Sequence, residues 1–198
     1  MATIGVTGHR VLTDVEKISA GVDEALRRIE EAFPGEMLTV VSPLAEGADR
    51  LVTRQVLARP GARLVVPLPL ETGNYMAAFE SDESKREFLS LLDRAQGVIT
   101  LPPAPTRDEA YAAAGRYVLD HCDVLVAIWD GQLAQGRGGT AEVVAQARQR
   151  GLPLAWIHTA GCRPGAQKPT TTHEGVGKVS FERLPQYGSL PQDPQGQT

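Results

Sequence analysis

The sequence is poor in the residues that build structural metal sites. Among its 198 residues are only two cysteines, Cys122 and Cys162, with no CxxC pair. No histidine stands beside either of them at metal-ligand spacing. We therefore expect no metal site and no resident cofactor, and we expect Cys122, within an apolar stretch, to be a buried small side chain.

Long hydrophobic runs are also missing. No stretch approaches the roughly 20 apolar residues that a membrane span needs. Residues 3–7 already have a strand-like pattern, and no charged leader with a long apolar segment comes before them. These absences predict a cytoplasmic protein with no membrane partner.

An excess of positive charge is the third absence. The chain has 20 Lys and Arg against 24 Asp and Glu, which gives a formal net charge of −4. Proteins that bind DNA or RNA usually have a basic surface, so a nucleic acid is an unfavoured partner. A local basic pocket for one phosphate remains compatible with this balance. The 42% hydrophobic and 22% charged residues are typical of a globular chain.

Apolar runs alternate with helical patterns, which is typical of a parallel sheet with crossover helices. Three Ser/Thr-x-x-Glu patterns predict helix starts, at Thr13–Glu16, Ser84–Glu87 and Thr106–Glu109. The fold class predicted is α/β, a Rossmann-like three-layer sandwich with a mostly parallel central sheet flanked by helices. The expected strands are 3–7, 37–41, 63–67, 98–101, 124–129 and 154–158, and the clearest expected helices are 48–57, 106–121 and 140–150.

The character of the chain changes after residue 159, where Pro, Gly, Gln and Thr dominate. We expect residues 1–160 to form one Rossmann-like domain and residues 161–198 to be a polar tail. Within the tail, 176–184 can add one edge strand, and 191–198 is expected to be disordered.

In open parallel sheets, ligands lie outside the carboxyl ends of the strands. The residues that follow three of the expected strands are therefore the candidate ligand-binding residues: Thr7, Gly8, His9 and Arg10 after the first; Ala45, Glu46 and Gly47 after the second; Asp130, Gly138, Gly139, Thr140 and Glu142 after the fifth.

The last group carries the strongest signal. Glycines allow a backbone to approach a ligand closely, and a helix N-terminus favours a phosphate. Thr140 can bond a phosphate oxygen, Glu142 can face a ribose, and Arg10 can pair with a phosphate. Each has an ordinary alternative: the glycines of 136–139 can form a plain turn, Glu142 can be a favourable N-terminal charge, and Arg10 a surface residue.

Three motifs together resemble the SLOG superfamily, which is named for the DNA-processing Smf/DprA proteins and the LOG proteins. They are Gly-Val-Thr-Gly-His-Arg at 5–10, Ala-Glu-Gly-Ala-Asp at 45–49 and Gly-Gly-Thr-Ala-Glu at 138–142. The resemblance covers roughly residues 3–158. It implies a Rossmann-like fold with a nucleotide pocket between the first-strand loop and the Gly-Gly-Thr helix start. It also implies that a homodimer can form, as in LOG proteins.

LOG enzymes are phosphoribohydrolases, and the resemblance places their catalytic arginine and glutamate at Arg116 and Glu142. The segment around Glu142 is also similar to nucleoside deoxyribosyltransferases, whose nucleophilic glutamate stands at the comparable place. The full LOG pattern is incomplete here, since Gln135, Arg137 and Val143 stand where other residues are expected.

Three hypotheses follow. The first is a sensor-type domain that binds a nucleotide or a nucleotide-derived ligand, such as a NAD-derived or cyclic one. The second is an N-glycosidase acting on a nucleoside monophosphate through Glu142 and Arg116. The third is a DNA-associated protein of the Smf/DprA type. The incomplete catalytic pattern favours binding, and the acidic net charge disfavours DNA.

Overall fold

The structure is a computed structural model that describes residues 1–132, 139–160 and 175–185. Within these residues strands and helices alternate through most of the chain, as the apolar pattern predicts. The elements are β1 (Ala2–Gly8), α1 (Val15–Ala32), β2 (Leu38–Val41), α2 (Ala48–Leu57), β3 (Arg63–Leu68), α3 (Thr72–Met76), α4 (Asp82–Leu92), β4 (Gly97–Thr100), α5 (Arg107–Asp120), β5 (Val124–Trp129), α6 (Thr140–Gln149), β6 (Leu154–His158) and β7 (Val179–Glu182).

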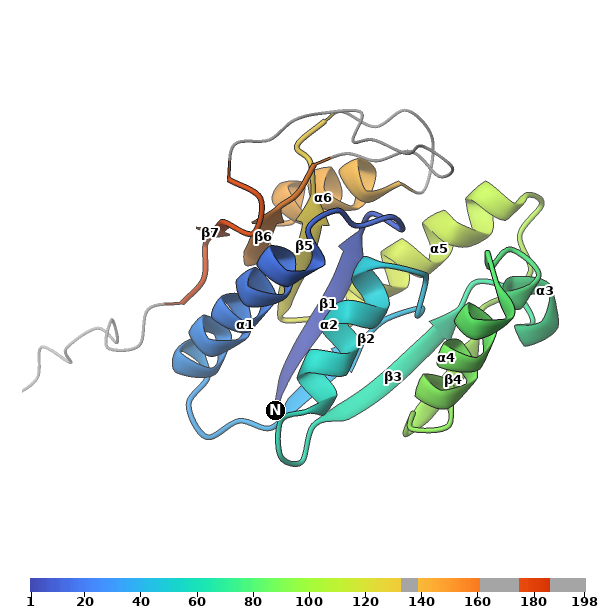
Figure 1. The fold of residues 1–198 in the computed structure, drawn as a ribbon, viewed down its shortest axis with the longest axis horizontal. Coiled ribbons are helices and arrows are strands. Elements are labelled where there is room, and N and C mark those ends of the chain that lie inside the picture. Colours follow the sequence, from blue (N-terminus) through green and yellow to red (C-terminus); the bar gives the residue numbers. More distant parts are fainter. Residues whose placement is uncertain (133–138, 161–174, 186–198) are drawn as a thin grey trace, which may run out of the picture.

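The strands of the described residues form one seven-stranded sheet in the order β4-β3-β2-β1-β5-β6-β7 (Figure 1). All neighbours are parallel except β6 and β7. The first strand is central: its Gly5 pairs with Val41 of β2 on one side and with Leu125 of β5 on the other. The chain therefore builds outward from β1 to β4 and then returns to the other side of β1. This reversal sets a topological switch point between β1 and β5.

Helices cover both faces of the sheet. On one face, α1 and α2 pack on the strands, and α4 lies beside α2 (Figure 1). On the other face lie α5 and α6, which contact each other and the central strands. All six residues of β5 are buried, as expected for a strand covered on both sides. The predicted α/β fold class is confirmed.

Of the three capping boxes predicted from the sequence, one caps a helix in the structure and two do not. Thr106 caps α5, since its hydroxyl accepts the Glu109 amide at 3.2 Å. The pattern at Ser84–Glu87 lies inside α4, whose cap is Ser81. At α1 the N-cap is Asp14 with φ 54°, and no side chain caps that helix.

The last described strand, β7, comes from beyond residue 160 and pairs with the edge of β6. Just before it, the Gly177 amide donates to the His158 carbonyl at 2.8 Å. The carboxylate of Glu182 in β7 accepts from Arg148 of α6 at 2.7 Å. The edge strand considered for 176–184 is thus present at Val179–Glu182, whereas the expectation for 191–198 concerns residues outside the described ranges.

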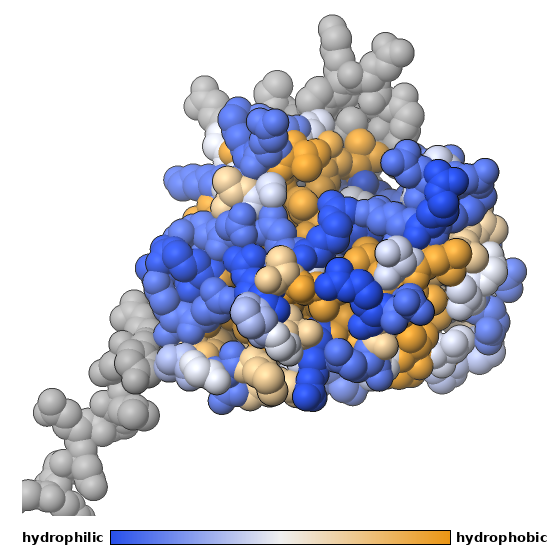
Figure 2. Space-filling view, turned by 60° about the horizontal axis from the view of Figure 1, so that its bottom comes forward, coloured by the Kyte–Doolittle hydropathy of each residue, from blue (hydrophilic) through white to orange (hydrophobic). Residues whose placement is uncertain are grey.

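No helix among the described residues is long and apolar enough to cross a membrane. Figure 2 brings forward the edge at which the strands begin, where hydrophobic residues show between hydrophilic ones. Met1 and Met37, about half exposed, lie at the starts of β1 and β2 on that side. A groove of about 600 Å³ lies there too, between the end of α1 and β7, and is lined by residues that include Arg28 and Phe181. The candidate site lies at the opposite edge.

Candidate functional site

The candidate site is the edge at which β1, β2 and β5 end. Because β1 and β5 are neighbours but connect to strands on opposite sides, the loops that leave them diverge. Such a switch point leaves room for a ligand above the strand ends. The loop after β1, the β2–α2 segment and the first turn of α6 all reach this edge, and each contains residues that the sequence singles out.

Two glycines hold the β1 loop close to α2. A Cβ on Gly8 would lie 2.4 Å from the Ala48 Cβ. Gly47 has φ +78°, and a Cβ there would lie 2.2 Å from the Arg10 carbonyl oxygen. Both glycines are therefore required by close backbone approach. The three-residue turn 8–10 is fixed in place by these contacts, with Thr7 half-buried at the end of β1.

His9 sits where β1, β5 and α2 meet. Its amide donates to the Ile128 carbonyl at 3.0 Å, and its carbonyl accepts the Ala48 amide at 3.1 Å. Its Nε2 lies 3.2 Å from the amide nitrogen of Asp130 and 3.2 Å from the Asp130 Oδ1. The structure therefore brings His9 and Asp130, both candidate residues, into direct contact.

Arg10 is exposed and points over an aromatic side chain. Its Cζ lies 5.4 Å from the ring centroid of Tyr111 on α5, within the range of a cation–π contact. The next ring in the cluster is Tyr75, at 6.2 Å from Tyr111. Tyr75 is buried and packs edge-on against Phe79, and burial raises its pKa. Tyr75 is therefore part of the core, while Tyr111 supports the arginine.

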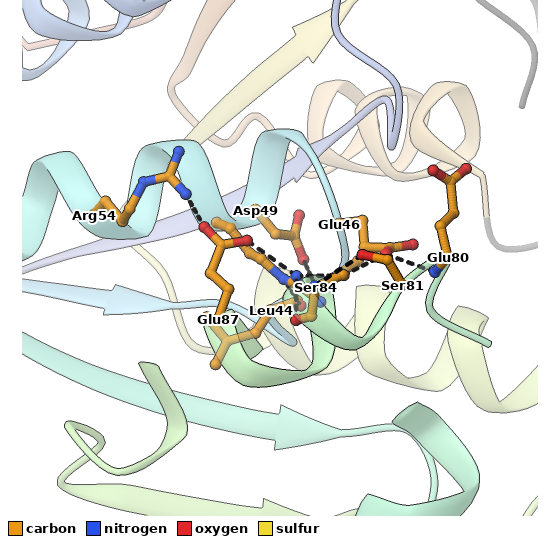
Figure 3. Close-up of polar contacts among 10 residues, drawn as sticks. Leu44, Glu46, Asp49, Arg54, Glu80, Ser81, Ser84 and Glu87 are labelled. Atoms are coloured by element: carbon orange, nitrogen blue, oxygen red, sulfur yellow. Dashed lines mark hydrogen bonds and ion pairs between the residues drawn. The ribbon is translucent and has the colours of Figure 1, made fainter. Parts of the chain in front are cut away.

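The predicted ligand residues of the β2–α2 segment are engaged with the protein itself. The Glu46 carboxylate accepts from the Glu80 amide at 3.0 Å and from the Ser84 hydroxyl of α4. The Ala45 amide donates to the Asp49 Oδ2 at 3.1 Å. Figure 3 shows Glu46 directed to Ser84 and Glu80. Gly47 faces the β1 loop, but Glu46 faces away from it, toward α4.

Asp49 and Arg50 lie in the first turn of α2, where the sequence favours charges exposed on the helix surface. Both are buried instead. Burial raises the pKa of Asp49 to about 7, against the opposing effects of its bond from Ala45 and the nearby charge of Arg10. This burial is not predictable from the local pattern, because polar residues in the first turn of a helix are usually solvated.

Arg50 joins α2 to α4. Its Nε donates to the Leu44 carbonyl at 3.0 Å, and its Nη1 lies 2.9 Å from the Ser84 carbonyl and 3.1 Å from the Glu87 Oε2. The exposed Arg54 also donates to Glu87, as Figure 3 shows. The Phe79 ring lies 4.6 Å from the Arg50 Cζ. Ser84 and Glu87, which resemble a helix cap in sequence, are the partners of this buried arginine.

The N-cap of α6 is Gly139, which is exposed and has no side chain of its own to cap the helix. Thr140 and Glu142 are half-buried in the first turn. The Glu142 Oε1 accepts from Gln146 at 3.2 Å, one turn further along. Gly138 lies outside the described residues, as does most of the glycine loop. The first turn of α6 otherwise lies as the sequence predicts, at the strand-end edge.

Arg116 follows Gly115, a residue at which α5 and α6 come into close contact. A Cβ on Gly115 would lie 2.9 Å from the Val143 Cγ2, so the two helices touch at the residues adjacent to Arg116 and Glu142. Arg116 itself is exposed. Asp120, one turn further along α5, accepts from Arg150 of α6 at 2.5 Å.

Among the residues that the structure describes, no three His, Cys, Asp or Glu side chains gather as metal ligands. Burial raises the pKa of Cys122 to about 12, so the thiol is not poised as a nucleophile.

Comparison with protein-family models and with curated proteins finds no match. Among solved structures, the chain is similar to DNA processing protein A (DprA) from Streptococcus pneumoniae, with a TM-score of 0.50 and 16% identity over 79% of this chain. The match covers 50% of that protein, so the chain spans about half of its length. A second similar structure is that of TM1055, a structural-genomics target, with a TM-score of 0.46, 16% identity and coverage of 78% of this chain and 72% of that one. The likeness to DprA shows the fold alone, an α/β Rossmann-like fold.

Proposed function

We propose that this chain binds a nucleotide or a nucleotide-derived ligand, as a sensor-type domain, at the edge where β1, β2 and β5 end. The observation that carries the proposal is the tight junction at the switch point. There Gly8 and Gly47 hold the β1 loop against α2, and His9 reaches across to Asp130 of the β5 end. Fixed backbone at the end of a central strand is where open α/β sheets bind ligands.

The charged side chains near this junction suit a phosphorylated ligand. Arg10 is exposed and supported by Tyr111, so its guanidinium is available to a phosphate. The first turn of α6 follows Gly139, which has no side chain to cover the helix N-terminus, so backbone amides there can face an anion. Glu142 in that turn is a hydrogen-bond acceptor for ribose hydroxyls. The site thus combines an arginine for a phosphate, a helix N-terminus and an acceptor for ribose hydroxyls. This set fits a nucleotide better than an uncharged metabolite.

One observation favours catalysis as a second candidate. The contact of Gly115 with Val143 puts Arg116 and Glu142 on adjoining turns of α5 and α6. In an N-glycosidase, the bond from the sugar C1′ to the base nitrogen breaks, water supplies hydroxyl to C1′, and the base takes the proton. Glu142 would stabilise the cationic sugar in that step, and Arg116 would hold the phosphate.

Association with DNA has less support. The name of the similar protein, DNA processing protein A, describes that protein. This chain has a net charge of −4, and no basic surface is indicated by its composition.

The test is a thermal-shift panel of AMP, GMP, CMP, NAD, ADP-ribose, cyclic ADP-ribose and cyclic dinucleotides, with chromatography of each sample afterwards. A ligand at 100 times its Kd stabilises a protein by about 2.7 kcal/mol. For a chain of this size that raises Tm by roughly 5–10 °C. A shift with intact ligand supports a sensor, and released base supports the N-glycosidase. No shift and no turnover would contradict the proposal, and light scattering of the same samples would report any homodimer.

Two variants locate the site. Glu142→Ala should abolish the shift with little change in Tm of the free protein. Its control is Glu83→Ala, which removes an exposed acidic residue from the first turn of α4. Arg10→Ala should weaken the binding of AMP more than that of adenosine. Arg86→Ala, which removes an exposed arginine from α4, should change neither affinity. If Glu142→Ala binds like the unmodified chain, the pocket is elsewhere.

A further inference from the structure

The backbone of His9 is held from two sides, and its ring contacts Asp130. The amide is bonded to β5 and the carbonyl to the first residue of α2, as described above. The side chain is about one quarter exposed, and Asp130, its partner, is 9% exposed. The switch point therefore holds an imidazole that is partly open to solvent.

The His9 Nε2 has a partner in either protonation state. In the neutral ring, Nε2 accepts from the Asp130 amide and the hydrogen is on Nδ1. When the ring gains a proton, Nε2 becomes a donor, and the Asp130 Oδ1 lies 3.2 Å away to accept it. The same Oδ1 also accepts the Gln132 amide at 3.1 Å, which fixes the carboxylate. Gain of a proton therefore exchanges the bond from the Asp130 amide for one to the Asp130 carboxylate, so that Nε2 contacts Asp130 in both states.

We propose that His9 couples ligand binding at this edge to proton uptake, and that the site thereby selects ligands with an anionic group of the phosphate class. The inference rests on the proposed function for the location of the ligand. The imidazolium adds a positive charge beside Arg10, and its Nδ1–H bonds to no other described residue. By linkage, an anionic ligand raises the proton affinity of His9, and a fall in pH raises affinity for the ligand.

Other titratable groups at this edge must be separated from His9. They are Arg10 on the same loop, Glu46 and Asp49 on the β2–α2 segment, and Glu142 on α6. Asp49 is the main competitor, because burial raises its pKa to about 7. Protonation of Asp49 would remove a negative charge and would also favour an anion as the pH falls. The two effects have the same sign, so only variants can distinguish them.

The first measurement needs no ligand. Nitrogen-15 chemical shifts of the His9 ring should place the hydrogen on Nδ1 at pH 8.5 and on both nitrogens at low pH. A ring with its hydrogen on Nε2 at pH 8.5 would overturn the inference.

The second measurement is calorimetry of ADP-ribose binding at pH 7 in buffers of different ionisation enthalpy. The diphosphate of ADP-ribose does not change its charge between pH 6 and 8, so any proton taken up on binding must be bound by the protein. We expect net uptake, and affinity about 3- to 10-fold higher at pH 6 than at pH 8, with no such change for adenosine. Both effects should vanish in His9→Gln, whose side-chain carbonyl can still accept the Asp130 amide.

Controls make the outcomes separable. Asp49→Asn should keep the proton uptake, and so should His121→Asn, which changes an exposed histidine at the other end of α5. Uptake that survives in His9→Gln, or disappears in Asp49→Asn, would overturn the coupling alone. No heat with ADP-ribose, together with no shift across the nucleotide panel, would overturn the coupling along with the proposed function.

Discussion

At the scale of single residues, Gly47 connects the sequence to the candidate site most directly. Its φ of +78° disfavours any side chain, and a Cβ would also meet the Arg10 backbone. Gly35 has nearly the same φ, +76°, but nothing lies within 4 Å of a Cβ there. The two positions therefore separate backbone strain from steric contact.

We predict that Gly47→Ala lowers the free energy of unfolding by about 2 kcal/mol more than Gly35→Ala does, because the Arg10 backbone has to move. It should also abolish any nucleotide-induced shift in Tm, whereas Gly35→Ala should leave that shift in place. Urea denaturation of both variants is the measurement. Equal losses in the free energy of unfolding would mean that the β1 loop moves away from the new Cβ without destabilising the protein.

Asp49 makes stability depend on pH. Its pKa is about 7 in the folded protein, against 3.8 for an unperturbed carboxyl, so the folded state binds the proton more tightly. Stability therefore falls as the pH rises from about 4 to 7, and is constant above that range as far as this group is concerned. Asp49→Asn keeps an acceptor for the Ala45 amide and has no charge to bury.

We therefore expect Asp49→Asn to be more stable than the unmodified chain at pH 8, on the order of a few kcal/mol, and nearly equal to it at pH 4. Chemical denaturation at both pH values measures this difference. A difference that is as large at pH 4 as at pH 8 would mean that Asp49 is not the group responsible.

At the scale of elements, α2 and α4 are joined by Glu87, which accepts from two arginines of very different exposure. Arg50 is 2% exposed and Arg54 is 49% exposed. Loss of a buried partner leaves charged and polar groups unpaired, at a cost of about 3–5 kcal/mol. Loss of an exposed ion pair costs about 0–1 kcal/mol.

Arg50→Ala should therefore destabilise the protein by about 3–5 kcal/mol, and Arg54→Ala by less than about 1 kcal/mol. Thermal and urea denaturation of the pair provide the comparison. Similar small losses would show that α4 is held on α2 by its apolar contacts, such as those of Phe88, and that the arginine bonds add little.

Much of the element pattern could be predicted from sequence, because strands covered on both faces are continuous apolar runs. The strands at 124–129 and 154–158 and the helix at 48–57 have the bounds expected. The helix starts were harder. Ser84 and Glu87 match a capping box by type and spacing, but both bond to the buried Arg50, which lies 34 and 37 residues earlier in the chain.

The candidate site was predictable only in part, for a related reason. The strand ends predict that Gly8, Gly47 and Gly139 lie at one edge of the sheet, and they are found there. The contact between His9 and Asp130 joins residues 121 positions apart, which no local pattern reveals. Nor does a local pattern tell that Glu46 faces α4 or that Asp49 is buried.

At the scale of the whole molecule, β7 shows that the sheet does not end with residue 160. It covers the edge of β6, and its Glu182 pairs with Arg148 of α6. Gly177, before the strand, packs against the Lys17 carbonyl of α1. An unpaired β6 edge would be open to other chains.

A chain that ends at residue 185 should therefore keep the Tm of the full chain within about 2 °C, and one that ends at residue 160 should lose roughly 5–10 °C, the effect of about 2–3 kcal/mol. It should also aggregate on heating. Calorimetry and light scattering of the three chains measure both effects. If the chain of 160 residues is as stable as the full one, residues 1–160 are a self-sufficient domain and β7 is an accessory.

The central place of β1 has a consequence during synthesis. One side of β1 pairs with β2, about 35 residues later, but the other side must wait for β5, about 120 residues later. At a translation rate of 5–20 residues per second, that edge stays open on the ribosome for roughly 6–24 s. The nascent chain thus carries an unpaired apolar strand for much of its synthesis. We expect chaperones that bind nascent chains to engage the half-made sheet there. Codon changes that slow the synthesis of residues 100–130 should reduce the soluble yield without altering the finished protein.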